Sequence, residues 1–390
     1  MGKLPEKLQS KLTERLGNNA LRKLPSSAGL VDFSSNDYLG LAMNEGLTQI
    51  ATGFLEGKRS VNGSSGSRLL TGNHGLYKEL EDFLTQHHRA ESALVFNSGY
   101  DANIGFFSSV PQRGDIVLYD ELIHASIRDG IQMGHAKGYK FAHNNLDSLE
   151  RKLQSLRVQL GSDGDVFVVT ESVFSMDGDS PDLKRLANFC TEEGCFLVVD
   201  EAHATGVLGE GRDLICQLGL EHEVFARIIT FGKAIGCHGA AILGPEKLKA
   251  YLVNFARSFI YTTALPPHTV ATILASYQYI RDNGTELSER LLENITYFKK
   301  QVSLLDLEDC FIESNSAIQC ALVPGNEKVK TIAAALQEEG FEVKPILSPT
   351  VKEREERLRF CLHAHNTKEE ISRILHIVQR ILGEKGILHN

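Results

Sequence analysis

Short apolar runs and longer amphipathic stretches alternate along the chain from about residue 90 onward. The apolar runs predict strands buried on both faces, and the amphipathic stretches between them predict helices. Among these helices, the clearest are Leu146–Leu160 and Leu183–Glu193. Strands are expected at 93–96, 115–119, 139–143, 166–171, 196–200, 228–230 and 240–243. This alternation predicts an α/β fold with a mostly parallel, doubly wound sheet, whose last short strand pair is antiparallel because little chain separates its members.

Helical spacing also covers both ends of the chain. Leu4–Leu24 predicts an N-terminal helix that carries Arg22, and a long helix is expected from Pro267 to about Leu305. The last third predicts a small α+β domain, with strands near 317–323, 342–347 and 358–363 and helices at 328–339 and 368–382. A chain of 390 residues is too long for one ordinary core. We therefore predict an N-terminal helix and arm (1–45), a large α/β domain (46–285) and a small C-terminal domain (286–390).

Composition narrows the class of protein. The net charge of −9 argues against a nucleic-acid-binding surface. The seven cysteines form neither a CxxC pair nor a zinc-spaced cluster, which predicts reduced thiols and no metal site. No apolar run approaches the roughly 20 residues that span a bilayer, and the start MGKLPEKLQ lacks a signal peptide's apolar core. Glu6 also stands where a myristoylation site has Ser or Thr. We expect a cytoplasmic protein that does not bind membranes.

Two polar residues follow neighbouring predicted strands. Asp200 ends the apolar run FLVVD, and Lys233 follows the run at 228–230 among small and apolar residues. In open α/β sheets the carboxyl ends of the strands face the ligand crevice, so both side chains are expected to enter one cleft. A desolvated lysine is a nucleophile toward carbonyls, and an acid can hold a pyridine nitrogen protonated. This pair indicates pyridoxal phosphate (PLP), which forms a Schiff base with lysine.

Three further features fall at predicted strand ends. The turn Ser98-Gly99-Tyr100 opens a helix, whose first N–H groups can bind a phosphate. His124 follows the next strand, where an imidazole can stack on a flat ring, and Ser175 follows a fourth. Taken alone, each of these features is more often structural than functional. The glycine- and serine-rich segment at 63–73 lacks both the P-loop and the dinucleotide-binding fingerprint.

Together these motifs resemble the α-oxoamine synthases, a family of fold-type I PLP enzymes. The matching segments, in chain order, are SNDYLGL, GSRLLTGN, SGY, IHAS, ESVFSMDGD, VDEAHATG and TFGKAIG. The segments FAHNN, IYTTALPP and SNSAIQ are similar to the branch that condenses L-alanine with pimeloyl-CoA, or with pimeloyl carrier protein, and releases CO2 in biotin synthesis. The chain departs from the family pattern at Asp213, where a glycine commonly follows the arginine.

The resemblance implies a role for each matching residue. Lys233 is expected to hold the cofactor covalently and to act as base and acid at the substrate α-carbon. Asp200 would pair with the ring nitrogen, His203 with the phenolic oxygen, and His124 would stack over the ring. The expected cofactor contacts also include Gly99, Tyr100, Ser175 and Thr230 of the same chain, and Thr262 and Thr263 from a second subunit, which implies a homodimer with shared sites. The expected substrate contacts are Arg359 and Asn36 for the amino acid and Arg22 and Thr350 for the acyl chain.

Three alternatives stay open on the sequence alone. One is a sister enzyme with another amino acid and acyl thioester, such as glycine with acetyl-CoA. Another is a catalytically silent subunit that binds a partner, although Lys233, Asp200 and His203 together argue against it. A dehydrogenase is disfavoured because the dinucleotide fingerprint is missing.

Overall fold

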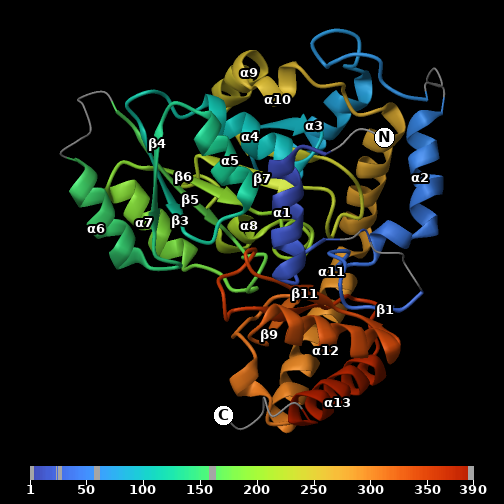
Figure 1. Cartoon of the computed structure of the whole chain (residues 1–390). Coiled ribbons are helices and arrows are strands. Elements are labelled where there is room, and N and C mark those ends of the chain that lie inside the picture. The colour runs from blue at the N-terminus through green and yellow to red at the C-terminus, as the bar shows by residue number, and fades with distance from the viewer. Residues whose placement is uncertain (1–3, 23, 25–28, 57–61, 158–163, 385–390) are drawn as a thin grey trace. The chain divides into compact units, whose positions relative to one another are not determined.

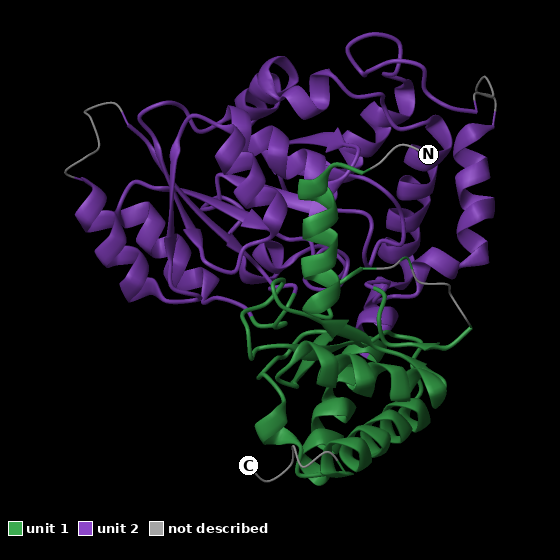
Figure 2. Ribbon diagram, in the orientation of Figure 1, with its two compact units in different colours: residues 1–35, 176–179, 290–390 green, residues 36–175, 180–289 purple. Residues whose placement is uncertain are grey.

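The computed structural model describes residues 4–22, 24, 29–56, 62–157 and 164–384 (Figure 1). These residues form two compact units (Figure 2). Unit 1 comprises residues 1–35, 176–179 and 290–390, and unit 2 comprises residues 36–175 and 180–289. The three-part division expected from the sequence stays a prediction. Residues 1–35 belong to the same unit as the C-terminal third, and the last boundary falls within helix α11 (Pro267–Leu304).

Unit 2 is built on a seven-stranded sheet in the order β2-β8-β7-β6-β5-β3-β4. All pairs are parallel except those that involve β8, which is antiparallel to both β7 and β2. The mostly parallel sheet and its antiparallel last pair are therefore confirmed. The strands are β2 (Ser92–Phe96), β3 (Ile116–Asp120), β4 (Lys137–Phe141), β5 (Val166–Glu171), β6 (Phe196–Asp200), β7 (Ala226–Thr230) and β8 (Ala240–Gly244).

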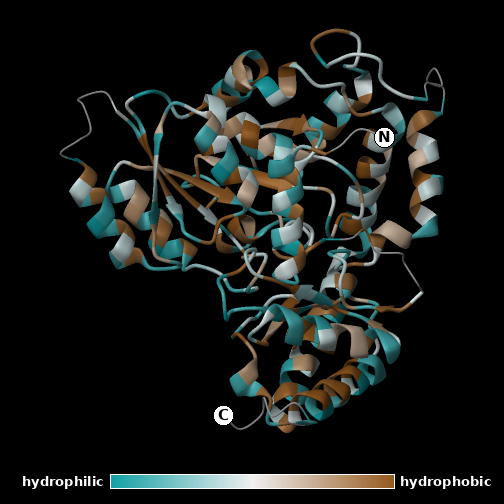
Figure 3. Cartoon of the chain, in the orientation of Figure 1, coloured by the Kyte–Doolittle hydropathy of each residue, from teal (hydrophilic) through white to brown (hydrophobic). Residues whose placement is uncertain are grey.

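Helices cover both faces of this sheet, so its strands other than the edge strand β4 are hydrophobic on both sides. Phe167, Val169 and Val198 point into one core, which α4 (Gly99–Ser109), α5 (Ala125–Met133), α9 (Glu246–Phe255) and α10 (Arg257–Ile260) help to build. The residues next to them in each strand face the opposite core, with α6 (Leu146–Arg157), α7 (Leu183–Glu192) and α8 (Leu214–Leu218). Two-sided burial explains why the strands read as continuous apolar runs, and Figure 3 shows the resulting hydrophobic colour along them. The remaining helices of unit 2 are η1 (Leu41–Met43), α2 (Glu45–Leu55) and α3 (Gly75–His87).

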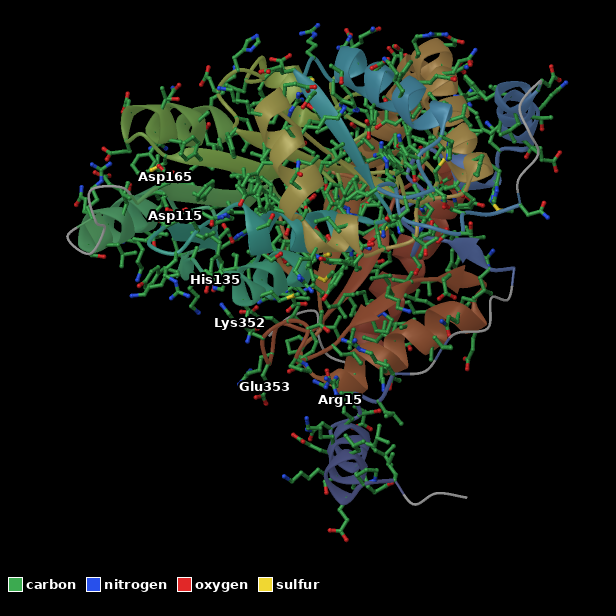
Figure 4. All side chains as sticks on the ribbon, turned by 90° about the horizontal axis from the view of Figure 1, so that it is seen from above. Arg15, Asp115, His135, Asp165, Lys352 and Glu353 are labelled. Carbon is green, nitrogen blue, oxygen red and sulfur yellow. The ribbon has the colours of Figure 1, made fainter. Side chains whose placement is uncertain are left out.

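Hydrogen bonds between neighbouring segments fix the amino-terminal edge of the sheet. The Asp115 carboxylate, just before β3, accepts the N–H of Asp165, just before β5, at 3.0 Å (Figure 4). It also accepts the N–H of Gln112 at 2.6 Å. These bonds set the register in which Ile116 lies opposite Val166. Parallel strands in register end together at the opposite edge, where β6 ends at Asp200 and β7 at Thr230.

Unit 1 contains an antiparallel sheet of β11 (Lys344–Ile346), β12 (Arg357–Cys361) and β9 (Ile318–Leu322), as the α+β prediction requires. A parallel pair joins β1 (Val31–Asp32) to β10 (Phe341–Glu342). Helix α13 (Lys368–Glu384) is amphipathic, and Figure 3 shows hydrophobic and hydrophilic residues alternating along it. The other helices are α1 (Glu6–Gly17), η2 (Glu308–Cys310) and α12 (Asn326–Glu338).

Several predicted boundaries were wrong. Helix α1 ends at Gly17 rather than Leu24, because Asn18 caps it and Asn19 takes a left-handed backbone with φ of 51°. Strand β4 lies two residues before the prediction because it is the sheet edge, where only Phe141 is buried and the apolar signal is weak. Residues 158–160 of the helix predicted to end at Leu160 lie outside the described residues. No helix in the described ranges is both long enough and apolar enough to cross a bilayer.

Candidate active site

Asp200 and Lys233 line the same pocket of unit 2, as the sequence predicted. The pocket has a volume of about 230 Å³ and lies at the carboxyl ends of β5, β6 and β7. Strand β6 ends at Asp200, and β7 runs parallel beside it with Asp200 opposite Ile228. The strand order therefore brings together two residues that are far apart in the chain. Among the described residues, the lining consists of Ser98, Gly99, Tyr100, Asn103, His124, Ser126, Glu171, Asp200, Ala202, His203, Thr230, Gly232, Lys233, His238 and Gly239.

A tight loop between β7 and β8 carries Lys233. The Gly236 N–H donates to the Lys233 carbonyl at 2.8 Å, and the Cys237 N–H donates to the Phe231 carbonyl at 2.7 Å. Gly236 has a left-handed φ of 69°, and a Cβ on it would lie 2.4 Å from the backbone nitrogen of Ala42. Only glycine combines that backbone with that close approach without strain. The loop therefore holds Lys233 at the pocket through backbone geometry.

One end of the pocket fits a phosphate group. Helix α4 begins at Gly99, so its first N–H groups have no acceptor within the helix. The Thr230 hydroxyl is buried beside them and has no hydrogen-bond partner among the described residues. A Cβ at position 99 would lie 2.7 Å from Cγ2 of Thr230, so glycine keeps this cradle open. The first N–H groups of α4 and the Thr230 hydroxyl are thus available as hydrogen-bond donors around an open space, as the binding of a buried cofactor phosphate requires.

Two carboxyl groups of the lining lie in register on neighbouring strands. Asp200 is opposite Glu171, and both are at least 95% buried. Burial, reinforced by the nearby Asp200 charge, raises the pKa of Glu171 to about 8. Both oxygens of Asp200 accept hydrogen bonds, from the Asn103 amide and from the Ala202 N–H, each at 2.9 Å. Asp200 is therefore held as the acceptor that a protonated pyridine nitrogen needs.

His124 lines the same pocket from the start of α5. Its backbone N–H donates to the Glu171 carboxyl at 2.6 Å, and its ring Nδ1 lies 2.7 Å from the Ser126 hydroxyl. Part of the residue is open to solvent. Desolvation of the buried part lowers the pKa of the imidazole, and this effect is larger than the opposing effect of the Asp200 charge, which raises it. These contacts favour a neutral imidazole, which suits stacking on a flat ring.

His203 is buried and hydrogen-bonded to Tyr38, a residue that the sequence pattern did not indicate. Its Nδ1 lies 2.6 Å from the Tyr38 hydroxyl, which donates to the Asn36 side chain at 3.2 Å. Both partners belong to the motif SNDYLGL, far upstream in the chain. This chain of contacts connects the predicted substrate residue Asn36 to the predicted partner of the cofactor's phenolic oxygen.

The structure does not bring every predicted residue of unit 2 to the pocket wall. Among the described residues, the lining does not include Ser175, Asn36, Thr262 or Thr263. The Asn97 amide donates to the Thr262 hydroxyl at 3.0 Å and to the Thr263 carbonyl at 2.6 Å. The structure therefore places these threonines next to Asn97 of their own chain.

The remaining predicted substrate residues belong to unit 1. The Arg22 guanidinium donates to the Thr350 hydroxyl at 3.3 Å, so the structure brings together two residues predicted to contact the same acyl chain. Arg359 lies on β12, is buried, and donates to the Cys361 sulfur at 2.9 Å. Its place opposite Cys320 in the antiparallel sheet fixes it on a rigid element.

Sequence reasoning missed Asn103, Ser126, Glu171 and Tyr38. Asn103 and Ser126 lie inside helices, where the apolar pattern marks only the core-facing positions. Glu171 could have been predicted from the sequence, because it is an acidic residue at the end of a buried strand, which is the same feature that indicated Asp200. Tyr38 offered no such signal, because its partner is 165 residues away.

The sequence matches the profile of the family described as aminotransferase class I and II over residues 28–378. It is 40% identical to 8-amino-7-oxononanoate synthase from Emericella nidulans, and the match covers 100% of each chain. A putative 8-amino-7-oxononanoate synthase from Methanococcus vannielii is 34% identical over 96% of this chain and 99% of its own.

Two solved structures extend the similarity. Serine palmitoyltransferase from S. paucimobilis, solved with bound PLP and myriocin, superposes with a TM-score of 0.86 at 26% identity and covers 98% of each chain. 8-Amino-7-oxononanoate synthase from Francisella tularensis superposes with a TM-score of 0.76 at 29% identity, over 92% of this chain and 99% of the other. The cofactor of this fold and pocket is PLP, which agrees with the free phosphate donors and the Asp200 acceptor.

The fold, the Lys233–Asp200 pocket and the full-length similarity agree with one another, and they place this chain in the aminotransferase class I and II family as an α-oxoamine synthase, a PLP-dependent acyltransferase.

Proposed function

We propose that the protein condenses L-alanine with a pimeloyl thioester to give 8-amino-7-oxononanoate, a free thiol and CO2. The observation that supports this chemistry most directly is that Lys233 and Asp200 line one pocket with the phosphate cradle. The choice of substrates rests on the full-length similarity to 8-amino-7-oxononanoate synthases. A place in biotin synthesis and a cytoplasmic location are part of the same proposal.

In this reaction a bond forms between the alanine α-carbon and the thioester carbonyl carbon. The carbon–sulfur bond breaks, the alanine carboxylate leaves as CO2, and the α-carbon regains a proton. When bound, PLP supplies an aldehyde that captures the amino group and a ring that withdraws electrons from the α-carbon. The protein must therefore hold that ring protonated, move protons at the α-carbon and orient both substrates.

The chain's own groups suit these tasks. Lys233 Nζ would hold the cofactor covalently and, once released, take the α-proton from alanine and later return one. Asp200 would keep a proton on the ring nitrogen, and His203 would hydrogen-bond the phenolic oxygen. His124 would stack over the ring, with Ser175 beside the cofactor. The first N–H groups of α4, at Gly99 and Tyr100, and the Thr230 hydroxyl would bind the phosphate.

Four further residues would bind the substrates. The buried Arg359 guanidinium would pair with the alanine carboxylate, as a fork of donors matches a carboxylate. Asn36 would assist it. Arg22 and Thr350, already hydrogen-bonded to each other, would contact the acyl chain. The acyl group would arrive on coenzyme A or on a carrier protein.

We further propose a homodimer with shared active sites. Thr262 and Thr263 would reach the phosphate of the partner's cofactor rather than their own. Neither threonine is among the described residues that line the pocket of its own chain, and this supports the arrangement.

Steady-state kinetics with alanine, glycine and serine test the substrates, each paired with pimeloyl-CoA, acetyl-CoA and palmitoyl-CoA. The serine and palmitoyl-CoA arm is included because the structural neighbours include serine palmitoyltransferase. We expect the highest kcat/KM for alanine with pimeloyl-CoA, with 8-amino-7-oxononanoate identified by mass spectrometry. A higher kcat/KM for glycine with acetyl-CoA, or for serine with palmitoyl-CoA, would assign a sister reaction instead. A colourless protein that turns over no pair would indicate a silent subunit.

A further inference from the structure

A line of hydrogen bonds connects the two groups expected on the cofactor ring. Asn103 Nδ2 donates to Asp200 Oδ2 at 2.9 Å and also to the Ser126 hydroxyl oxygen at 3.0 Å. The Ser126 hydroxyl lies 2.7 Å from His124 Nδ1. Asn103, Ser126 and Asp200 are all at least 95% buried, so water does not compete for the contacts among these three residues, whereas His124 is partly open to solvent. The neighbouring helices α4 and α5 each contribute one of the two connecting residues.

The acceptors fix the direction of every bond in this line. Asp200 accepts on both oxygens, so Asn103 must present its amide nitrogen, since the flipped amide would place its oxygen against a carboxylate. The two amide hydrogens then go to Asp200 and Ser126. The Ser126 oxygen therefore accepts from Asn103, and because His124 Nδ1 already accepts the Ser126 backbone N–H, the Ser126 hydroxyl hydrogen donates to that same ring nitrogen. The Ser126 backbone N–H, at 3.3 Å, donates to the same ring nitrogen.

A histidine whose Nδ1 accepts two hydrogen bonds must carry its proton on Nε2. The line of bonds thus selects one tautomer of a neutral imidazole. A neutral ring is compatible with stacking on a protonated pyridine ring, whereas an imidazolium would repel it. The same bonds orient the Asp200 carboxylate that would keep that pyridine protonated.

The arrangement leaves one polar atom of Asn103 without a partner among the described residues. Its side-chain oxygen is buried and has no hydrogen-bond partner among the described residues. Leaving such an acceptor unsatisfied is unfavourable, so the position is not explained by folding alone. An asparagine at this position is explained if the site needs both N–H donors of its amide, one for the Asp200 carboxylate and one for the Ser126 hydroxyl.

We propose that Asn103 and Ser126 are positioning residues that fix His124 as the neutral Nε2–H tautomer and couple its orientation to that of Asp200. The proposal rests on the proposed function in one respect, that His124 and Asp200 act on the same cofactor ring. The tautomer itself is a property of the protein and can be measured independently of turnover.

The direct test is selective ¹⁵N-histidine labelling of the PLP-loaded full chain. A His124→Asn variant identifies the signals of this ring among the 14 histidines. We expect the chemical shift of His124 Nδ1 in the range of an unprotonated ring nitrogen and that of Nε2 in the protonated range. A protonated Nδ1 in the wild-type protein would overturn the proposal without any further variant.

Ser126→Ala and Asn103→Ala test the line itself. We expect each to move the His124 shifts toward a mixture of tautomers, and to lower kcat for alanine about tenfold, the effect of one hydrogen bond, with little change in KM. Ser92→Ala is the matched control, since it removes a buried hydroxyl that donates to Gly244 at 2.9 Å, outside the pocket. It should leave the His124 shifts unchanged.

Unchanged His124 shifts in both Ser126→Ala and Asn103→Ala would contradict the proposal even if kcat fell. Failure of the proposed function would look different. A wild-type protein that turned over no alanine, but gave the expected shifts and the expected response to both variants, would contradict the substrates and support the tautomer assignment.

Discussion

Among the described residues that line the Lys233–Asp200 pocket, Glu171 is the one whose protonation the folded structure alters most clearly. It lies beside Asp200 and accepts the His124 N–H, and its pKa is raised to about 8 from 4.5 by burial first and the Asp200 charge second. Between these two pH values the folded state holds a proton that the unfolded chain has lost. The stability of the folded protein therefore falls as pH rises through this window.

Replacement of Glu171 by glutamine tests this directly. Glutamine keeps an acceptor for the His124 N–H and cannot ionise, so we expect the variant to gain stability relative to wild type as pH rises. The expected gain is on the order of 1–3 kcal/mol at pH 7.5 compared with pH 5. Urea unfolding of the PLP-free protein at both pH values measures it. A constant difference between the two proteins would show that Glu171 does not carry this proton.

The individual site residues were predictable to different degrees. Asp200 and Lys233 were found because each follows a buried strand and because their chemistry is complementary. Asn103 and Ser126 were missed because their importance comes from a line of hydrogen bonds between α4 and α5. A one-dimensional pattern carries no record of which polar side chains two neighbouring helices bring together.

At the scale of elements, the loop between β7 and β8 depends on Gly236. Its φ is 69°, and a Cβ at this position would lie only 2.4 Å from the backbone of Ala42, which leaves no room for a side chain. We expect Gly236→Ala to destabilise the protein by about 1–3 kcal/mol and to weaken PLP binding, because the loop carries Lys233. Thermal unfolding and PLP titration measure the two effects.

Gly53→Ala is the control, because this helical glycine has open space around it. It should leave PLP binding unchanged and slightly raise stability, by about 0.4–1 kcal/mol. Equal effects of the two substitutions on PLP binding would contradict a specific role for the loop at Gly236.

Asp213, the departure from the family pattern, caps helix α8. Its carboxylate accepts the Cys216 N–H at 2.7 Å and the Arg227 guanidinium at 2.9 Å, and it contacts His88 at 2.7 Å. Burial alone would raise the pKa of Asp213, but the His88 hydrogen bond and the Arg227 charge outweigh it and hold the pKa well below the ordinary 3.8. The aspartate at this position is therefore the centre of a buried ion network.

We expect Asp213→Asn to cost about 3–5 kcal/mol of stability, since it leaves a buried guanidinium without its charge partner. A depressed carboxyl pKa contributes stability above the unfolded value, so the difference from wild type should shrink as pH falls below 3.8. Unfolding curves at pH 7 and at pH 3.5 test this. Asp282→Asn, in an exposed pair with Arg281, is the control and should change stability by less than about 1 kcal/mol. A similar loss of stability in both variants would show that the buried ion network around Asp213 contributes no more to stability than an exposed ion pair.

The sheet of unit 2 was predictable from the sequence because its strands are buried on both faces and read as continuous apolar runs. The predicted boundaries of helices and strands were wrong where this apolar pattern is weak. Edge strand β4 is mostly exposed, and the end of α1 is set by the backbone of Asn18 and Asn19 rather than by an apolar pattern.

At the scale of the whole molecule, the shared active site of the proposed dimer predicts complementation. We expect Lys233→Ala and the double variant Thr262→Val/Thr263→Val to be nearly inactive when each is expressed alone. Co-expression in equal amounts should restore about one quarter of wild-type activity, since random pairing of a two-fold dimer gives one intact site in half of the dimers. Sedimentation confirms that dimers form.

As a control for subunit exchange, each of the two variants is also combined with the wild-type protein. Activity that stayed at the level of the separate variants, in a mixture shown to contain heterodimers, would place the threonines in the same site as Lys233 of their own chain.

The most direct test of the assigned active site is to trap the cofactor on the protein. The PLP-loaded protein is reduced with borohydride and digested, and the peptides are sequenced by mass spectrometry. We predict a pyridoxyl phosphate group on Lys233 in wild type and none anywhere in Lys233→Ala, which should remain folded. A modified lysine elsewhere in the chain, or full turnover by Lys233→Ala, would contradict the assignment of the active site.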